Sequence, residues 1–111
     1  MQPKSNLWIE KDGEVVLSKW RVNLLRAIDQ TGSISAAAEA MKVSYHRAWE
    51  KLHEMEMRLG VALVETQTGG IHGGGAQLTD AARDYAARFE KFSQGIDEIV
   101  AHHFADSFGL K

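Results

Sequence analysis

The sequence of 111 residues predicts a mainly α-helical winged helix-turn-helix domain with a small β component. Four segments repeat apolar residues at helical spacing, and a Ser or Thr able to cap a helix stands before each of them. Two shorter segments combine β-rich runs with glycine-containing turns. The length suits one domain with one core. We therefore expect a single domain over residues 1–111 with an N-terminal β-hairpin, a β-wing and a long C-terminal dimerisation helix.

Residues 1–17 predict the β-hairpin. Two apolar runs between Leu7 and Leu17 flank the dipeptide Asp12-Gly13. Glycine adopts the positive φ that a tight hairpin turn requires. We therefore place the turn at this dipeptide.

Residues 18–60 predict three helices, of which the second and third form a helix-turn-helix over residues 33–59. Small alanines in the second helix allow another helix to cross closely. Lys42 occupies the turn, where glycine or asparagine is common, so we expect mild backbone strain there. The third helix turns one apolar stripe inward. The caps are Ser18, Ser33 and Ser44, the helix stops are Gly32 and Gly60, and the stripe is Ala48, Leu52, Met55 and Leu59.

Residues 61–78 predict the wing, and residues 79–104 predict a long helix capped by Thr79. The wing strands are expected at Val61–Thr66 and Ala76–Leu78, on either side of a glycine-rich loop. The long helix carries an apolar stripe with little remaining chain to cover it. A homodimer formed by antiparallel packing of two such helices would bury the stripe. The predicted dimer interface is Tyr85, Phe89, Phe92, Ile96 and Ile99.

The stretch from Gly32 to about Tyr85 carries a more specific set of motifs. They are Gly32-Ser33-Ile34-Ser35-Ala36-Ala37-Ala38, Val43-Ser44-Tyr45, Ala48-Trp49, Leu63-Val64-Glu65, Thr68-Gly69-Gly70, Gly73-Gly74-Gly75-Ala76 and Leu78-Thr79. This stretch resembles the DNA-binding domain of ModE-type molybdate-responsive regulators and, more distantly, that of LysR-type regulators. The resemblance implies a homodimeric transcriptional regulator that binds an inverted repeat in double-stranded DNA. ModE proteins carry an oxyanion-binding part after the long helix; because the sequence ends at Lys111, we expect that part to be lacking.

The first turn of the third helix is the predicted recognition surface, because a recognition helix places this turn nearest the bases. Arg47 is expected to donate two hydrogen bonds to guanine, and Lys51 to contact phosphate. His72 of the wing is expected near the DNA backbone or minor groove. Trp49 is expected to pack against the wing or the first helix. The predicted DNA contacts are Ser33, Ser35, Ser44, Tyr45, His46, Arg47, Lys51, Thr68 and His72.

The charge distribution leaves a second function open. The net charge is −2 with neutral histidines, and residues 1–59 carry nine Lys and Arg against eight Asp and Glu. DNA-binding domains are usually more basic. A protein-interaction module that uses the winged fold to bind another regulator is therefore the alternative hypothesis.

Composition excludes several other classes. Without cysteine there are no disulfides or thiolate sites, which fits a cytoplasmic protein. The sequence shows no catalytic constellation, no signal peptide, no membrane-spanning run and no evident ligand or cofactor site. Gly75 is followed by Ala76-Gln77 and not by the Lys and Ser or Thr of a phosphate-binding loop. His102, His103 and Asp106 make a weak metal pattern, and we expect no metal site.

Overall fold

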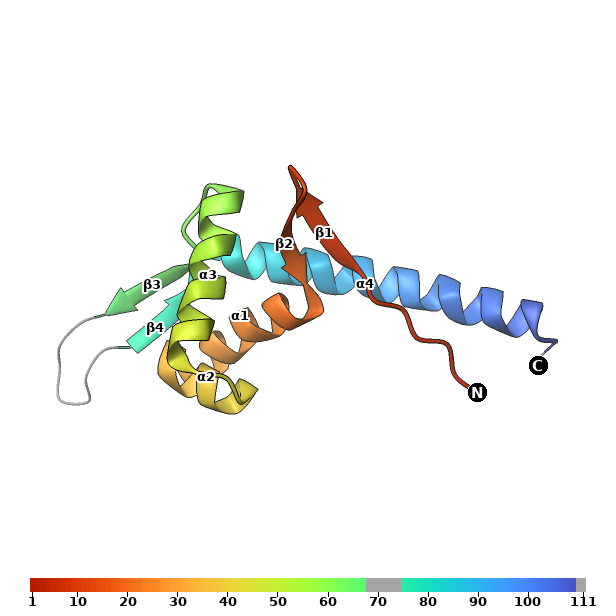
Figure 1. Ribbon diagram of the computed structural model, residues 1–111, viewed down its shortest axis with the longest axis horizontal. Helices are drawn as coiled ribbons and strands as arrows, with labels where there is room; N and C mark the ends of the chain where they lie inside the picture. The colour runs from red at the N-terminus through yellow and green to blue at the C-terminus, as the bar shows by residue number, and fades with distance from the viewer. Residues whose placement is uncertain (68–74, 110–111) are drawn as a thin grey trace.

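The order of elements in the computed structural model, which describes residues 1–67 and 75–109, confirms the predicted winged helix-turn-helix architecture (Figure 1). The elements are β1 (Trp8–Lys11), β2 (Glu14–Ser18), α1 (Lys19–Thr31), α2 (Ile34–Met41), α3 (Tyr45–Leu59), β3 (Val64–Gln67), β4 (Gly75–Leu78) and α4 (Asp80–Ser107). Each strand pair forms its own antiparallel two-stranded sheet. The helices therefore make up most of the domain, and the two small sheets flank them.

All four helices begin at the predicted caps. The side-chain oxygens of Ser18, Ser33, Ser44 and Thr79 each accept a hydrogen bond from the backbone N–H three residues on, at 2.9–3.2 Å. This satisfies one of the donors that the start of a helix leaves unpaired. At the other end, α1 and α3 stop at Gly32 and Gly60, both left-handed with φ of 80° and 73°.

Lys42 ends α2 in the same left-handed conformation, with φ of 60°. A side chain makes this conformation costly, whereas glycine adopts it freely. We expect Lys42→Gly to raise the free energy of unfolding by about 0.5–1 kcal/mol, measured by urea denaturation. Lys42→Ala is the control, because alanine retains the strain and should leave stability nearly unchanged. An equal gain from both variants would show that the lysine side chain, and not its backbone, is unfavourable.

The N-terminal hairpin turns at Asp12 and Gly13, as predicted, with φ of 54° and 81°. Its register shifts between Ile9 and Glu10, because Val16 is an extra residue opposite them. The shift buries Val16 and its neighbour Leu17 together, at 3% and 4% exposure, where regular alternation would expose one of them. Both pack in a small cluster with residues of α1 and α4, so the hairpin covers part of α4.

The main core lies where α1, α2 and α3 meet the base of the wing. Its fully buried side chains are Leu24, Leu25, Ile28, Leu52, Met55, Leu63 and Leu78. Ala37, Ala38 and Ala48 are also buried in it, as expected for helices that cross closely. The inward stripe predicted for α3 is therefore correct, with Leu59 partly buried at its end.

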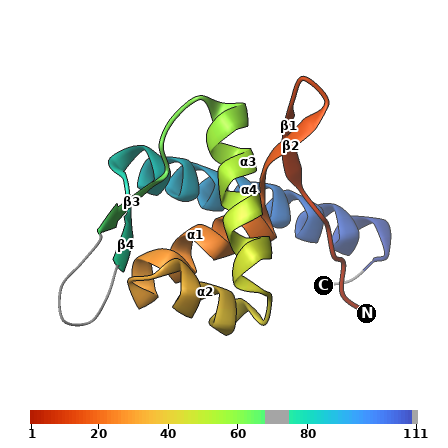
Figure 2. The same ribbon diagram turned by 60° about the vertical axis from the view of Figure 1, so that its left-hand side comes forward.

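Helix α4 runs along the length of the molecule, whose extents are 60 × 29 × 23 Å (Figure 1). Two ion pairs bind its first half to α1, from Arg26 to Glu90 at 2.7 Å and from Arg83 to Asp29 at 3.2 Å. The second half projects beyond the other helices. Figure 2 shows α3 in the middle of the domain, with the wing on one side of it and the hairpin on the other.

Candidate nucleic-acid interface

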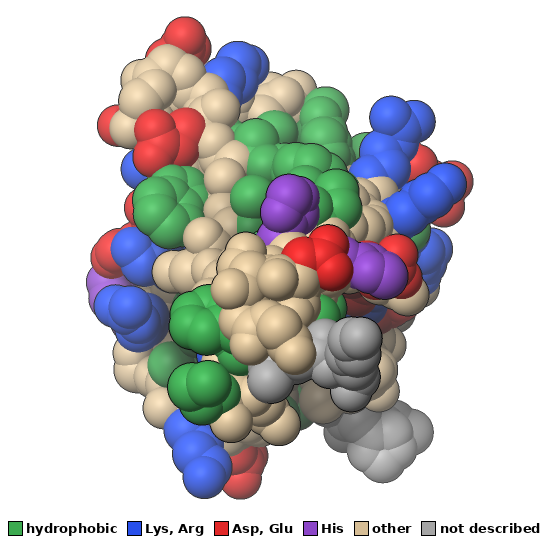
Figure 3. Space-filling view, turned by 90° about the vertical axis from the view of Figure 1, so that its right-hand side faces the viewer, with side chains coloured by type: hydrophobic (Ala, Val, Ile, Leu, Met, Phe, Trp, Pro, Cys, Tyr) green, Lys and Arg blue, Asp and Glu red, His purple; other side chains and the backbone are tan. Residues whose placement is uncertain are grey.

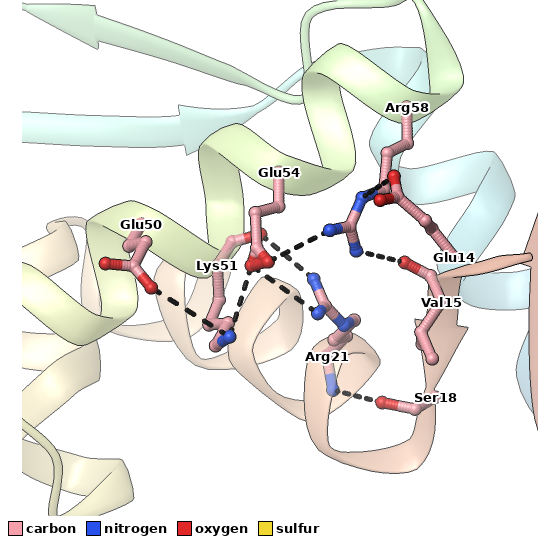
Figure 4. A network of polar contacts seen from close by, with 8 residues as sticks. All are labelled: Glu14, Val15, Ser18, Arg21, Glu50, Lys51, Glu54 and Arg58. Atoms are coloured by element: carbon pink, nitrogen blue, oxygen red, sulfur yellow. Dashed lines mark hydrogen bonds and ion pairs between the residues drawn. The ribbon is translucent and has the colours of Figure 1, made fainter.

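Helix α3 has three distinct sides. The core side carries Ala48, Leu52 and Met55. A flank carrying Arg47, Lys51, Glu54 and Arg58 faces α1 and the hairpin, as the contacts of Lys51, Glu54 and Arg58 show (Figure 4). The remaining side is exposed and includes His46, Trp49, Glu50 and Met57. This exposed side, together with the first turn of α3, is the surface that could enter a DNA groove.

The exposed side carries aromatic and imidazole groups and few full charges. His46 Nε2 lies 3.5 Å from Glu50, one helical turn away. Trp49 is 41% exposed, and its ring stacks on His53 of the same helix at 3.8 Å between centroids. The Trp49 ring is thus stacked along α3, and its expected packing on the wing or first helix stays a prediction.

A crevice of about 220 Å³ separates the start of α2 and α3 from the wing. Ser33, Ser35 and Tyr45 line it from the helix-turn-helix side, and Thr66 and Gln67 from the wing. Tyr45 is 53% exposed. Hydroxyl and amide groups such as these can donate to phosphate or base edges. Three predicted contacts thus lie together at the wing-side crevice.

Hydrogen bonds fix the base of the wing to the helix-turn-helix region. The Ala76 N–H donates to the Gly32 carbonyl at 2.7 Å, and a Cβ on Gly75 would lie 3.2 Å from the same oxygen. The Leu63 N–H donates to the Glu56 carboxylate at 2.8 Å. This bond holds the chain before β3 in a loop, so β3 begins at Val64 and the predicted start at Val61 is wrong.

A second hollow, the hairpin cleft, lies between β1–β2 and α3 and encloses about 410 Å³. Its lining includes Trp8, Ser18, Lys19, Trp20, Arg47 and Lys51. The guanidinium carbon of Arg47 lies 5.8 Å from the centre of the Trp20 ring. A cation over an aromatic face is attracted to it. Arg47 therefore turns toward α1 and lies on the flank of α3.

A network of ion pairs forms the floor of this region (Figure 4). Glu54 accepts from Lys51 at 3.2 Å and from Arg58 at 3.3 Å, and it lies 3.7 Å from Arg21. Arg58 also donates to the Val15 carbonyl of β2 at 2.8 Å, and Arg21 donates to the Lys51 carbonyl at 3.3 Å. Glu54 thus joins α1 to α3 directly and, through Arg58, to the hairpin.

The pKa values in this network respond to burial and to the neighbouring charges. Burial lowers the pKa of the Arg21 guanidinium, and repulsion from Arg58 and Arg47 lowers it further against the attraction of Glu54. Burial alone would raise the pKa of Glu54, but Lys51, Arg21 and Arg58 outweigh burial and lower it. Three cations therefore hold the Glu54 carboxylate ionised, and two of them also pair with Glu50 and Glu14.

We expect Glu54→Ala to lower the free energy of unfolding by roughly 1–3 kcal/mol, because it leaves Arg21 buried without its counter-charge. Glu50→Ala is the control, since that carboxylate is 52% exposed and should contribute less than about 0.5 kcal/mol. Urea denaturation measures both. Because the pKa of Glu54 is lowered, its contribution is present above about pH 4.3, the ordinary carboxyl value, and is lost as the pH falls further. A difference between wild type and variant that does not shrink as the pH falls below the ordinary carboxyl value would contradict this assignment.

Some of the remaining predicted DNA contacts are exposed, one is partly buried and two lie outside the described residues. Ser44 caps α3 as an acceptor, its O–H donates to no residue in the described ranges, and His46 is exposed. Lys51 lies within the ion-pair network, with its side chain 23% exposed. Thr68 and His72 lie outside the described residues. Lys19 and Trp20 of the hairpin cleft carry no sequence signal, because only the packing of α1 against α3 brings them beside Arg47.

The stripe on α4 divides into a covered and an exposed part. Phe89 is 3% exposed in the cluster under the hairpin, and Tyr85 is partly buried against the core. Phe92 and Ile99 are 46% and 54% exposed. Figure 3 shows the end of the molecule at which α4 finishes, where hydrophobic side chains lie exposed beside acidic groups and histidines. Only the later part of the predicted interface is therefore free for a partner.

Residues 1–67 and 75–109 contain neither a cluster of metal ligands nor a membrane-spanning helix. Within these ranges no three His, Cys, Asp or Glu side chains come together as metal ligands. None of the described helices combines the length and the apolarity needed to cross a membrane.

Comparison with known proteins gives one family match and several relatives. The family described as bacterial regulatory helix-turn-helix protein, lysR family, matches residues 21–83. The chain is 38% identical over 79 residues to the DNA-binding transcriptional dual regulator ModE of Escherichia coli (strain K12), covering 71% of this chain and 30% of that protein. It is 32% identical over 103 residues to the molybdenum transport protein ModE of Azotobacter vinelandii, covering 83% and 38%. The chain thus spans 30–38% of the length of these two relatives.

Solved structures share the fold. The DNA-binding domain of CbnR in complex with DNA superposes with a TM-score of 0.60 at 21% identity, over 78% of this chain and 94% of that one. Vibrio fischeri DarR in complex with DNA gives a TM-score of 0.62 at 14% identity, over 86% and 31%. At these identities the likeness concerns the architecture alone.

Proposed function

Since the chain belongs to the bacterial regulatory helix-turn-helix family of LysR type, we propose that it is a sequence-specific, double-stranded DNA-binding transcriptional regulator that acts as a homodimer. The observation that carries the proposal is the placement of α3. Its first turn and one whole side are exposed between two hollows, the wing-side crevice and the hairpin cleft. A helix presented in this way can enter a major groove of DNA, while the residues that line the two hollows contact the sugar–phosphate strands on either side of the groove.

The proposed contacts follow from this placement. His46, Trp49 and Glu50 would face base edges, and Tyr45 with Ser33 and Ser35 would contact the strand beside the wing. An indole in the groove can contact the methyl group of thymine, and a carboxylate can accept from cytosine N4. Ser44 at the start of α3 would donate to a phosphate near the helix N-terminus. Thr68 and His72 remain proposed wing contacts.

The proposed dimer interface lies on the projecting half of α4. An apolar groove there is lined by Arg88, Lys91, Phe92, Gly95, Ile96 and Ile99. A Cβ on Gly95 would meet nothing within 4 Å, so packing inside the protomer does not require a glycine at this position. A missing side chain does allow a second helix to cross closely.

Charge complementarity favours a second copy of the chain as the occupant of that groove. An antiparallel pair that crosses near Gly95 would set Lys91 of one helix beside Glu98 of the other. Opposite charges across an interface favour one register over others. Two helix-turn-helix regions joined in this way would bind half-sites separated by about 34–36 Å, one helical turn of DNA.

An unbiased selection of bound duplexes from a random pool, at moderate salt, tests the proposal. We expect an enriched inverted repeat with half-sites about one turn apart. The competing function is a protein-interaction module, favoured by the exposed Tyr45, Trp49 and Met57 on α3. Folded protein that enriches no sequence and binds duplexes weakly even at low salt would favour that second function.

A further inference from the structure

We propose that the hairpin cleft binds a backbone phosphate of DNA and that Arg47 contacts this phosphate and not a base. The inference rests on the proposed function, because it assigns part of the same surface. It differs from the sequence-based prediction, in which Arg47 recognises guanine. It also adds Lys19 of α1, and with it the hairpin side of the domain, to the contact surface.

The cleft is positively charged. Four of the described residues that line it are basic, Lys19, Arg21, Arg47 and Lys51, and none is acidic. Glu54 lies outside this lining and is already shared among Lys51, Arg58 and Arg21. Lys19 and Arg47 form no ion pair with any residue that the structure describes. Two cations thus remain for an external anion.

The charges within the cleft also act on one another. Repulsion from Arg47 and Arg58 contributes to the lowered pKa of Arg21. An anion beside Arg47 would offset this repulsion, since opposite charges stabilise the ionised guanidinium. A phosphate beside Arg47 would therefore reduce the repulsion between Arg47 and Arg21.

The direction of Arg47 decides between phosphate and base. Arg47, Lys51, Glu54 and Arg58 recur at helical spacing on one flank of α3, and this flank faces α1 and β2. The ring of Trp20 holds the Arg47 guanidinium toward that side. When a helix lies in a groove, its outward side meets the bases and its flanks meet the two sugar–phosphate strands. Arg47 is therefore placed to contact a sugar–phosphate strand of the DNA and not a base edge.

The test uses the duplex selected with the wild-type protein and each of its single-base-pair variants. Dissociation constants are measured over a salt series for Arg47→Ala and Arg47→Lys, and for Lys19→Ala and Lys19→Arg. Each phosphate contact contributes about 0.9 to the slope of log affinity against log salt, which corresponds to roughly tenfold in affinity near 0.1 M salt. Thermal unfolding of each variant confirms that it is folded.

We expect both alanine variants to bind every duplex about tenfold more weakly and to reduce the slope by about 1, without changing the order of preference. Arg47→Lys and Lys19→Arg should retain affinity, slope and preference. Lysine supplies the point charge that a phosphate needs, but it lacks the two parallel donors of arginine that guanine recognition uses. Relaxed preference at one base pair in both Arg47 variants would overturn the inference, as would an unchanged slope in Lys19→Ala.

Two further measurements identify the source of the phosphate. Replacing single duplex phosphates by neutral methylphosphonates should locate one position at which wild type loses affinity and Lys19→Ala loses nothing more. Exchanging chloride for inorganic phosphate at equal ionic strength should leave binding unchanged. A loss under phosphate that requires Lys19, with no methylphosphonate position affected, would assign the cleft to the free ion and overturn the inference. Wild-type protein that selects no duplex would instead refute the proposed function itself.

Discussion

Replacing both Phe92 and Ile99 of α4 by aspartate is expected to yield a folded monomer that binds a duplex with two half-sites about 100 to 10,000 times more weakly. The two side chains are 46% and 54% exposed, so the protomer does not depend on them for its core. Four carboxylates brought into one apolar interface would be desolvated without partners, which strongly opposes pairing. Once the two protomers separate, the second protomer no longer meets its half-site at a high effective concentration.

Sedimentation equilibrium and gel-shift titration measure the two consequences. Affinity for a duplex with one half-site should be unchanged, because the substitutions leave the helix-turn-helix and the wing intact. Ala101→Asp is the matched control, since it adds a carboxylate nine residues from Phe92, on the opposite, exposed side of the helix. That variant should remain dimeric. A double aspartate variant that also remains dimeric would place the interface elsewhere.

Leu52→Ala is expected to lower the free energy of unfolding by about 2–5 kcal/mol. Leu52 is 1% exposed on the core side of α3, where it packs with residues of α1, α2 and the wing base. Removing it opens a cavity that three helices and the wing base would have to close together. Since small domains are stable by only about 5–15 kcal/mol, this one change would remove a large share of the total.

Urea denaturation followed by circular dichroism measures the loss. Met57→Ala is the control on the same helix, because Met57 is 83% exposed and its truncation should change stability by less than about 0.5 kcal/mol. A Leu52 variant within 1 kcal/mol of wild type would mean that the helices close around the gap without cost.

The helix ends could be predicted because their determinants are local. Ser18, Ser33, Ser44 and Thr79 cap their helices as expected, and Gly32 and Gly60 end theirs. A cap needs only the chemistry of one residue and the amide three positions later. The hairpin turn at Asp12-Gly13 followed from the same kind of local requirement.

Features that depend on a distant neighbour were not predicted. The extra residue at Val16 follows from packing against α4, and no alternation pattern shows it. The stripe on α4 was recognised, but periodicity does not say what covers a helix face, so burial of Phe89 under the hairpin came from the structure. In the same way, the sequence placed Arg47 in the first turn of α3, and only Trp20 of α1 shows toward which flank it turns.

The bonds at the base of the wing have a thermodynamic consequence for recognition. The Gly32 carbonyl, the Glu56 carboxylate and the Leu63 carbonyl each accept a backbone N–H from the wing or its borders, at 2.7, 2.8 and 3.0 Å. The base of the wing is therefore oriented when the domain folds and not when it meets a ligand. Preorganised surfaces lose less conformational entropy on association. Contacts that Thr66 and Gln67 make with DNA should thus add to the binding affinity with little loss of conformational entropy. The distance from these residues to α3 is set before any duplex is bound.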